Sequence, residues 1–338
     1  MLKNYQMWNG TMDLKSELEK RHSAFEGYWK KYLPVSKPLN LYNASRHLTF
    51  SGGKRLRPAI AMFTSESVSG NIEDVLPFAA ALELMHNFTL VHDDIMDKSD
   101  LRRNQPTVHK KFGEPTAILA GDFLFAKSFE AMHDLPIDLQ KFKELDYLLV
   151  QCVLNICEGQ QLDIEFEKRK LVTEEEYIEM ISKKTGVLFE LAAKGGSIIG
   201  GGTQEEISAC THYGLNLGLA FQIWDDYLDI SSDEITLGKD IGNDIRNGKK
   251  TLIAVNSLQN ASGDNKNILD ELFGNINASD VDIKRVFNVF NDTGSIEYAR
   301  NTAISYINRA KDSLESLRDS EFKGILKDLA DYSILREK

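Results

Sequence analysis

The stretch FTLVHDDIMDKSDLRRNQPTVH, residues 88–109, joins an apolar segment to a run of acidic residues that leads into paired arginines. Its acidic core, DDIMD, has a counterpart later in the chain in IWDDYLD, residues 223–229. Both clusters end apolar segments whose residues recur with helical spacing. On a helix, residues four positions apart lie about 5–6 Å apart on one face, so Asp93 lies beside Asp97. Each cluster therefore places two carboxylates side by side at the end of a predicted helix.

Helical periodicity extends through nearly the whole chain. Apolar residues share one face near the N-terminus and again in the second half, as in the sets Leu14, Leu18, Phe25, Trp29, Leu33 and Ile207, Cys210, Leu217, Trp224, Leu228. Capping boxes at residues 173–176 and 203–206 mark further helix starts, the second directly after a GGG turn at 200–202. No alternating strand pattern or linker interrupts these helices, so the sequence predicts one all-α domain over residues 1–338. We expect the polar segment 260–267 to be a surface loop.

The composition is that of an acidic globular protein. The chain has 338 residues, 42% of them hydrophobic, and a formal net charge of -11. This charge argues against binding to nucleic acid, which requires a basic face. The three cysteines show no CxxC spacing, which argues against a zinc site or a disulfide framework. The N-terminus lacks an apolar signal core and no apolar run is long enough to cross a membrane, so we expect a cytoplasmic location and no transmembrane segment.

Each carboxylate pair, Asp93 with Asp97 and Asp225 with Asp229, brings together like charges that repel unless a cation compensates them. Only oxygen ligands are present, which suits a hard ion such as Mg²⁺ that keeps waters and bridges to phosphate. A solvated helix end is the alternative, but two clusters of identical spacing favour a metal site. An EF-hand is excluded because Ile95 stands at the third loop position and no glycine stands at the sixth.

Three Glu-x-x-His pairs suggest a different metal chemistry, because helical bundles with carboxylate-bridged di-iron sites use this spacing. The pairs are Glu19 with His22, Glu83 with His86 and Glu130 with His133. Such pairs are frequent by chance, and a di-iron site leaves both aspartate clusters unexplained. The magnesium interpretation is therefore favoured.

Three basic segments accompany the acidic clusters: GGKRLRP at 52–58, LRRNQPTVH at 101–109 and GKDIGNDIRNGKKT at 238–251. In the first, paired glycines permit close backbone approach, and Pro58 suits the first turn of a helix whose free N–H groups favour an anion. Any one segment alone is explained by a solvated basic surface. Together they predict a polyanion held between carboxylate-bound metal and cations, and this explains how an acidic protein can bind a diphosphate.

These motifs together resemble the trans-isoprenyl diphosphate synthase family, also called polyprenyl synthetases. The resemblance covers residues 52–251 and includes GGKRLRP, the DDIMD motif followed by Arg102 and Arg103, a KT pair at Lys184 and Thr185, and FQIWDDYLD with its GKD continuation. Several ordered motifs of this kind are very specific. The resemblance implies a single bundle of long antiparallel helices around a deep central cavity, and a homodimer.

The resemblance also implies a role for each site residue. The cradle for isopentenyl diphosphate would consist of Gly53, Lys54, Arg57, His86 and Arg103. The allylic diphosphate would be held by Arg102, Lys184, Lys239 and Lys249. Three Mg²⁺ ions are expected with substrate bound, held principally by Asp93, Asp97 and Asp225, with additional or water-mediated ligation by Asp94, Asp226, Asp229 and Asp244. The last basic segment is one residue longer than in some members, which leaves the roles of Asp240 and Asp244 open.

The implied reaction is ionisation of an allylic diphosphate, attack by the isopentenyl double bond, and loss of a proton to the released diphosphate. Thr185 and Gln222 would turn their oxygens toward the cationic carbon. Phe88, five positions before Asp93, would form the floor of the hydrocarbon cavity. An aromatic residue there, the small Thr89 after it and the absence of an insertion in DDIMD are similar to archaeal geranylgeranyl diphosphate synthases. We therefore expect mainly a twenty-carbon product, with fifteen carbons (farnesyl) or twenty-five carbons (farnesylgeranyl) as alternatives.

Two rival functions are weighed against this one. A terpene cyclase could share the fold and one aspartate motif, but it needs no second diphosphate cradle, so Lys54, Arg57 and Arg103 argue against it. An inactive partner subunit of a heteromeric synthase would be expected to have lost aspartates, and both motifs are intact.

Overall fold

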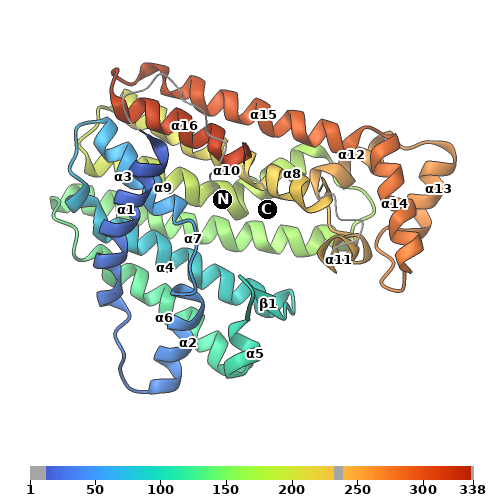
Figure 1. Cartoon of the computed structure of the whole chain (residues 1–338), viewed down its shortest axis with the longest axis horizontal. Coiled ribbons are helices and arrows are strands. Elements are labelled where there is room, and N and C mark those ends of the chain that lie inside the picture. Colours follow the sequence, from blue (N-terminus) through green and yellow to red (C-terminus); the bar gives the residue numbers. More distant parts are fainter. Residues whose placement is uncertain (1–12, 232–238, 336–338) are drawn as a thin grey trace. The chain divides into compact units, whose positions relative to one another are not determined.

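The computed structural model describes residues 13–231 and 239–335, and its regular structure is almost entirely helical (Figure 1). The predicted all-α fold is confirmed. The chain divides into two compact units. Unit 1 comprises Met1–Leu148, Leu191–Thr211 and Leu314–Asp328, and unit 2 comprises Leu149–Glu190, His212–Ser313 and Leu329–Lys338. That the chain is a single domain around a central cavity stays a prediction.

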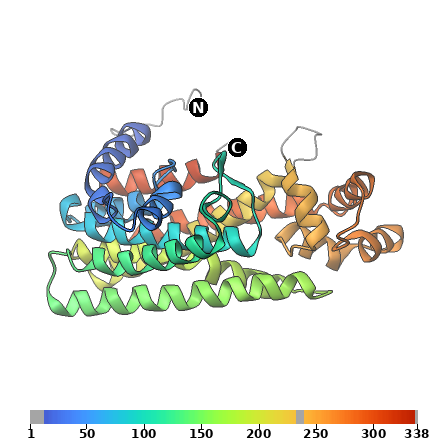
Figure 2. The same ribbon diagram turned by 90° about the horizontal axis from the view of Figure 1, so that it is seen from below.

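Unit 1 holds most of the N-terminal helices. Its elements are α1 (Leu14–Trp29), η1 (Lys30–Tyr32), α2 (Leu39–Thr49), α3 (Leu56–Ser67), α4 (Ile72–Met96), β1 (Leu101–Arg102), β2 (Gln105–Pro106), α5 (Val108–Phe112), α6 (Glu114–Met132) and η3 (Leu314–Ser316). Four helices contribute residues to both units, namely α7 (Leu139–Lys168), α9 (Val187–Ile199), α10 (Gln204–Ser231) and α16 (Glu321–Leu335). Of these, α7 is one continuous helix (Figure 2).

The core of unit 1 is built around α4, which packs most extensively against α6 and α3. Asn71 caps the start of α4 by accepting a hydrogen bond from the backbone N–H of Glu73 at 3.2 Å. Every residue from Val75 to Met85 is buried. The close approach of α4 and α6 depends on Gly121, because a Cβ there would lie 2.1 Å from Nε2 of His92. This packing fixes the C-terminal end of α4, where the first aspartate motif lies.

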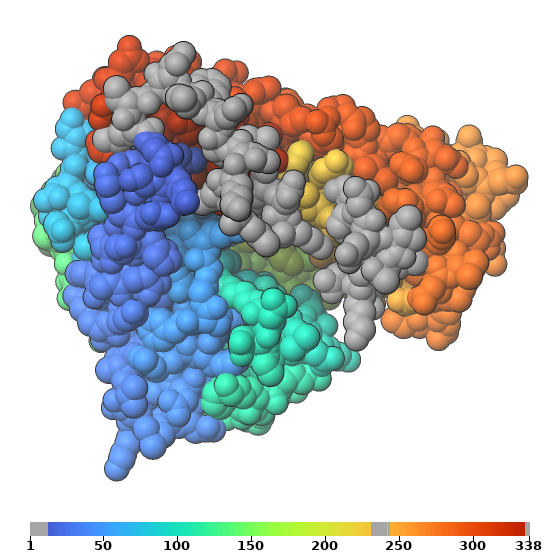
Figure 3. All heavy atoms as spheres, viewed as in Figure 1, coloured from blue at the N-terminus to red at the C-terminus, as the bar shows by residue number. Residues whose placement is uncertain are grey.

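A short hairpin follows α4, in which β1 pairs antiparallel with β2. Arg103 and Asn104 form its turn with φ values of 52° and 58°, and a two-residue hairpin turn requires such left-handed values. The sequence pattern did not predict these strands, because two residues are too few to show alternation. The teal segment that contains this hairpin and α5 lies on the surface of unit 1 in Figure 3.

Unit 2 contains α8 (Glu174–Ile181), the π-helical turn η2 (Ser182–Gly186), α11 (Lys239–Asn247), α12 (Leu252–Asn260), α13 (Gly263–Leu272), α14 (Asp280–Asp292) and α15 (Ser295–Ser313). Its core gathers apolar side chains from α8, α10 and α12 to α15 around Leu252, Ile253 and Phe290. The predicted loop at 260–267 is wrong beyond Ser262, because α13 begins at Gly263. The extended backbone of Ser262 and the acidic Asp264 in the first turn favour a helix start there.

Both predicted capping boxes are confirmed. The side chain of Thr173 accepts from the backbone of Glu176 and the carboxylate of Glu176 accepts from the backbone of Thr173, at 3.2 and 2.9 Å. Thr203 and Glu206 make the same two bonds at the start of α10. The predicted turn at 200–202 connects α9 to α10. In the parts of the chain that the structure describes, no helix combines the length and the apolar character needed to cross a bilayer.

Candidate functional site

The first half-site lies in unit 1 at the C-terminal end of α4. Asp93 is half-buried. Asp97, the C-cap residue of α4, is exposed. Asp94 differs from both, because it is fully buried and its Oδ1 accepts a hydrogen bond from Nε of Arg102 at 2.7 Å. Burial raises the pKa of Asp94, and the guanidinium of Arg102 opposes this rise. The motif thus presents two carboxylates outward and one inward.

The hairpin and the glycine-rich loop before α3 come together in unit 1. The guanidinium of Arg103 donates hydrogen bonds to the carbonyl oxygens of Leu48, at 3.4 Å, and Gly52. It also lies against Gly53, where a Cβ would stand 3.1 Å from Nη2 and where φ is +141°. Lys54, the next residue in the loop, is exposed. Two of the basic segments that the sequence singled out are therefore neighbours, although they are far apart in the chain.

His86 lies seven residues, about two helical turns, before Asp93 and is surrounded by cations. Burial lowers its pKa well below the ordinary value of 6.5, and the positive charges of Arg57 and Arg103 lower it further. The imidazole is therefore neutral at neutral pH and can act as a hydrogen-bond donor or acceptor, but not as a cation. Arg57, in the first turn of α3, is half-buried. Arg57, His86 and Arg103 of the predicted cradle therefore lie near one another in unit 1, and the role of the cradle residues stays a prediction.

His86→Gln is expected to reduce the pH dependence of stability below pH 6.5. As the pH falls, His86 takes up a proton in the unfolded chain before it can do so in the folded protein, so its contribution to stability is present above 6.5 and is lost below. Glutamine takes up no proton in this pH range, so it makes no pH-dependent contribution to stability. Between pH 7.5 and 5.5 the wild type should lose up to about 1.4 kcal/mol more unfolding free energy than the variant. Urea denaturation at the two pH values measures this difference, and equal losses would contradict it.

Phe88 packs within an aromatic group on α4 and α6. Its ring centroid lies 5.3 Å from that of Phe125 and 5.1 Å from that of His92, and Phe129 continues the group 5.2 Å beyond Phe125. Phe88 is half-buried. The ring of Phe88 therefore packs against other aromatic rings, and its role as the floor of a hydrocarbon cavity stays a prediction.

The di-iron interpretation is not supported by the surroundings of the Glu-x-x-His pairs. Glu83 is buried and forms an ion pair with Arg55, which leaves it no role as an iron ligand. His86 is surrounded by arginines, and such cations would repel a metal ion. Glu130 pairs with Lys127 on the surface of α6. These glutamates therefore serve as partners of cationic side chains.

The second half-site lies in unit 2, where α10 carries the second aspartate motif. Asp225 and Asp229 are half-buried, whereas Asp226 is buried. Tyr177 of α8 donates its hydroxyl to Oδ2 of Asp226 at 2.9 Å, and Gln222 donates its amide to Oδ1 at 3.0 Å. Burial raises the pKa of Asp226 to about 7, although Lys249 and the two hydrogen bonds oppose the rise. This motif repeats the burial pattern of the first: the residues at its first and fifth positions are partly exposed, and the residue at its second position is buried.

The π-helical turn η2 supplies Lys184 and Thr185. It lies directly against Gly159 of α7, where a Cβ would come within 2.4 Å of the backbone nitrogen of Lys184. The ammonium of Lys184 forms an ion pair with Asp163 of α7. The hydroxyl of Thr185 donates to Oε1 of Gln222 at 2.8 Å. Turns of this kind are frequent at functional sites, and this one connects the KT pair to the aspartate motif through Gln222.

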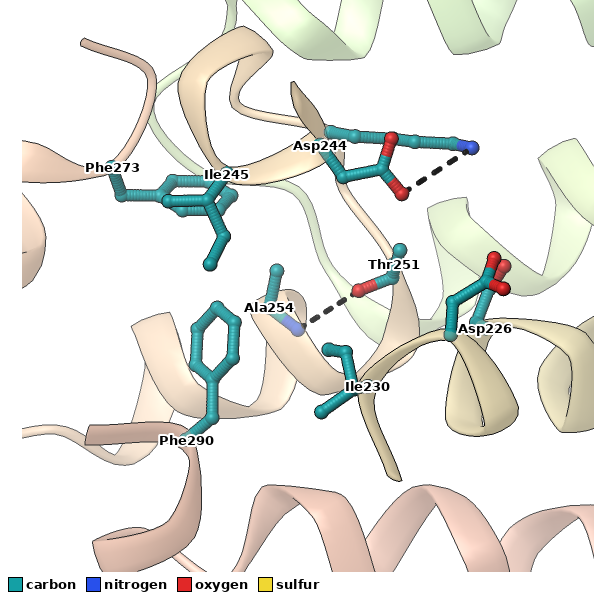
Figure 4. Close-up of a pocket in the computed structure, with 10 residues that line it drawn as sticks. Asp226, Ile230, Asp244, Ile245, Thr251, Ala254, Phe273 and Phe290 are labelled. Carbon is teal, nitrogen blue, oxygen red and sulfur yellow. Dashed lines mark hydrogen bonds and ion pairs between the residues drawn. The ribbon is translucent and has the colours of Figure 1, made fainter. Parts of the chain in front are cut away.

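Lys249 lies in the turn between α11 and α12 and contributes to two small pockets of unit 2. One pocket is lined by Asp163, Tyr177, Met180, Ile181, Lys184, Gln222, Asp226, Lys249, Lys250 and Thr251. The other, shown in Figure 4, brings Asp244 and Asp226 to the same opening, and Nζ of Lys249 lies 3.8 Å from the carboxylate of Asp244. Thr251 caps α12 through the backbone of Ala254. The side chain of Lys239 lies outside the described residues.

The outward-facing carboxylates fit a hard divalent cation. They offer only oxygen donors, in pairs four residues apart on one helix face. Over residues 13–231 and 239–335, no three acidic, histidine or cysteine side chains converge closely enough to chelate a metal by themselves. A cation held by one pair would therefore take its other ligands from water or from phosphate oxygens, which is the usual coordination of Mg²⁺.

Two residues that the sequence reasoning missed belong to the second half-site. Tyr177 binds Asp226, and Asp163 binds Lys184. Asp163 stands in EGQQLD, a polar run inside an otherwise amphipathic helix, and this run was a usable signal. Tyr177 carries no such signal, because a tyrosine in a helix is usually a packing residue.

A model of the family described as polyprenyl synthetase matches residues 38–290 of the chain. The chain belongs to this family. It is 44% identical over 327 residues to a geranylgeranyl diphosphate synthase of Methanosarcina mazei, and the match covers 96% of this chain and 99% of that protein.

Solved structures agree with the family assignment. The structure of a geranylgeranyl pyrophosphate synthetase from Pyrococcus horikoshii matches with a TM-score of 0.90 at 42% identity, covering 96% of this chain and 98% of that one. A polyprenyl synthase from Caulobacter crescentus, complexed with calcium and isoprenyl diphosphate, matches with a TM-score of 0.87 at 29% identity, covering 98% and 100%.

Proposed function

We propose that this polyprenyl synthetase is a Mg²⁺-dependent prenyltransferase that condenses isopentenyl diphosphate head-to-tail with an allylic diphosphate, mainly to geranylgeranyl diphosphate. The observation that carries the proposal is the pair of half-sites, each of which places an aspartate motif beside a cationic side chain: Arg102 contacts Asp94 in the first, and Lys249 lies near Asp226 and Asp244 in the second. A metal-bound diphosphate needs both kinds of partner. The similarity to the geranylgeranyl diphosphate synthase of M. mazei supports the proposed product.

The proposed reaction assigns a role to the cationic and the polar side chains of the half-sites. Lys184, Lys249 and Arg102 hold the oxygens of the allylic diphosphate, and their positive charges stabilise the negative charge that develops as it leaves. Mg²⁺, when bound, supplies Lewis-acid stabilisation of the leaving diphosphate. The hydroxyl oxygen of Thr185 and Oε1 of Gln222 are joined by a hydrogen bond, and each oxygen keeps a further lone pair. These free lone pairs can stabilise the allylic cation. The proton lost after condensation goes to the released diphosphate.

The proposed ligands of Mg²⁺ are principally Asp93, Asp97 and Asp225, with Asp229 and Asp244 as additional or water-mediated ligands. Asp94 and Asp226, which the sequence also placed in this set, are buried. We propose three ions with substrate bound. We also propose that the protein acts as a cytoplasmic homodimer, as the family resemblance implies.

The proposal is tested by incubating the purified protein with Mg²⁺, isopentenyl diphosphate and farnesyl diphosphate, followed by chromatography of the products. The expected product has twenty carbons. A farnesyl or farnesylgeranyl product would correct the chain length alone. Failure to consume isopentenyl diphosphate, with the protein folded and Mg²⁺ present, would overturn the proposed activity.

Lys54→Ala is expected to raise the Michaelis constant for isopentenyl diphosphate by about 10- to 100-fold, because a charge-assisted hydrogen bond contributes about 1.5–3 kcal/mol. The Michaelis constant for the allylic substrate should change less than about threefold, because Lys54 belongs to the cradle around Arg103 rather than to the aspartate motifs. Lys143→Ala removes an exposed lysine of α7 and provides the matched control. Equal effects on both substrates would show that the two diphosphate sites are misassigned.

A further inference from the structure

The two aspartate motifs share a burial pattern that follows from helix geometry. Position two of each motif continues a buried stripe with the spacing i, i+4, i+7. In α4 this stripe consists of Asn87, Val91 and Asp94, which are 0%, 1% and 0% exposed. In α10 it consists of Leu219, Ile223 and Asp226, which are 5%, 0% and 7% exposed. The second aspartate therefore points into its unit, away from the face that carries the first and fifth.

Each inward aspartate is engaged by a side chain of the proposed substrate site. Asp94 binds Arg102, and Asp226 binds Gln222 as well as the buried hydroxyl of Tyr177. Oδ2 of Asp94 is enclosed and has no hydrogen-bond partner among the described residues. A Mg²⁺ ion that keeps several waters needs open space around its ligand, and neither buried carboxylate offers it. The burial and the hydrogen bonds thus point away from metal ligation at both positions.

We propose that the second aspartate of each motif is a positioning residue and not a metal ligand: Asp94 orients Arg102 toward the allylic diphosphate, and Asp226 orients Gln222 toward the allylic carbon. This inference rests on the proposed function. It narrows the metal-binding set to outward-facing carboxylates. A positioning residue acts only through its partner, so its removal should add little once the partner has been replaced.

The first test compares Asp94→Asn with Asp97→Asn, a matched change in the same motif. Thermal unfolding is recorded in excess chelator, and Mg²⁺ affinity is measured by calorimetric titration in the presence of a non-cleavable allylic thiolodiphosphate. Asp94→Asn should lower Tm in chelator by several degrees, because it weakens a buried ion pair, and should change Mg²⁺ affinity less than about threefold. Asp97→Asn should leave Tm unchanged or raise it, because it removes a negative charge at a helix C-terminus, and should weaken Mg²⁺ binding by about 100-fold.

The second test separates a positioning role from a merely structural one. Asp94→Asn and Arg102→Gln should each raise the Michaelis constant for the allylic substrate about tenfold with little change for isopentenyl diphosphate, and the double variant should be no worse than Arg102→Gln by more than about twofold. The same non-additivity is expected for Asp226→Asn with Gln222→Ala. A purely structural role would lower the amount of folded enzyme and leave both Michaelis constants unchanged.

Three results would overturn the inference. The first is a loss of Mg²⁺ affinity in Asp94→Asn equal to that in Asp97→Asn. The second is a double variant whose Michaelis constant for the allylic substrate rises by the product of the two single effects. The third is an Asp94→Asn variant whose Michaelis constant for the allylic substrate equals that of the wild type. A wild-type protein that makes no prenyl diphosphate would instead overturn the proposed function. The crossed pattern of Tm and Mg²⁺ affinity does not depend on turnover, so the two failures can be told apart.

Discussion

Replacing Asp93 or Asp225 by alanine is expected to lower kcat by about 1,000-fold or more while the protein stays folded. Each change removes one arm of an outward-facing carboxylate pair, and with it a protein ligand of the proposed Mg²⁺. Preorganised positive charge at a leaving group is usually the largest single contribution to catalysis of this kind. Folding should survive, because both side chains are only half-buried and each change relieves a like-charge repulsion four residues along the helix.

Steady-state rates in saturating Mg²⁺ and thermal melting by circular dichroism measure the two parts of this prediction. Asp270→Ala, an exposed aspartate on α13, is the matched control and should keep the wild-type rate. Excess chelator should abolish wild-type activity, and added Mg²⁺ should restore it. Near wild-type turnover in either variant, or full activity in chelator, would contradict the metal assignment.

The features that could be predicted from the sequence are those that depend on neighbours along the chain. The helices follow from local apolar periodicity, and the caps at Thr173 and Thr203 follow from residues three positions apart. The direction of Asp94 could have been predicted too, because Asn87 and Val91 place it on the buried stripe of α4. The spacing of the carboxylates alone did not reveal this, since it treats every acidic residue of the motif as equivalent.

The features that could not be predicted depend on contacts between distant segments. Tyr177 reaches Asp226 from another helix, and no pattern around Tyr177 distinguishes it from a packing residue. The contact of Arg103 with the loop at Gly52 joins residues about fifty positions apart, and only the folded unit brings them together. The helix beginning at Gly263 was missed for a different reason, because its start depends on weak cap signals within a polar segment that also suits a loop.

Phe88→Ala is expected to lengthen the product by one or more isoprene units, from twenty carbons to twenty-five or more. A residue five positions before Asp93 lies about 7.5 Å further along the helix axis, which is the direction in which a growing hydrocarbon must extend from the metal site. The ring cannot easily turn aside to admit a longer chain, because Phe125 and His92 pack against it at 5.3 and 5.1 Å. Removing it leaves space where the proposed floor stood.

Chromatography of the products made from farnesyl diphosphate and excess isopentenyl diphosphate measures the change. Phe112→Ala, which removes a half-buried aromatic of α5 that packs on His47, is the matched control and should leave the product length unchanged. Phe88→Leu keeps apolar volume and guards against a folding defect, since truncating a fully buried phenylalanine to alanine costs about 3–5 kcal/mol of stability and the half-buried Phe88 should cost less. It should give a mixture of twenty and twenty-five carbons. If both Phe88 variants lose stability yet keep the wild-type product, Phe88 is a packing aromatic of the group with Phe125, and the chain is stopped elsewhere.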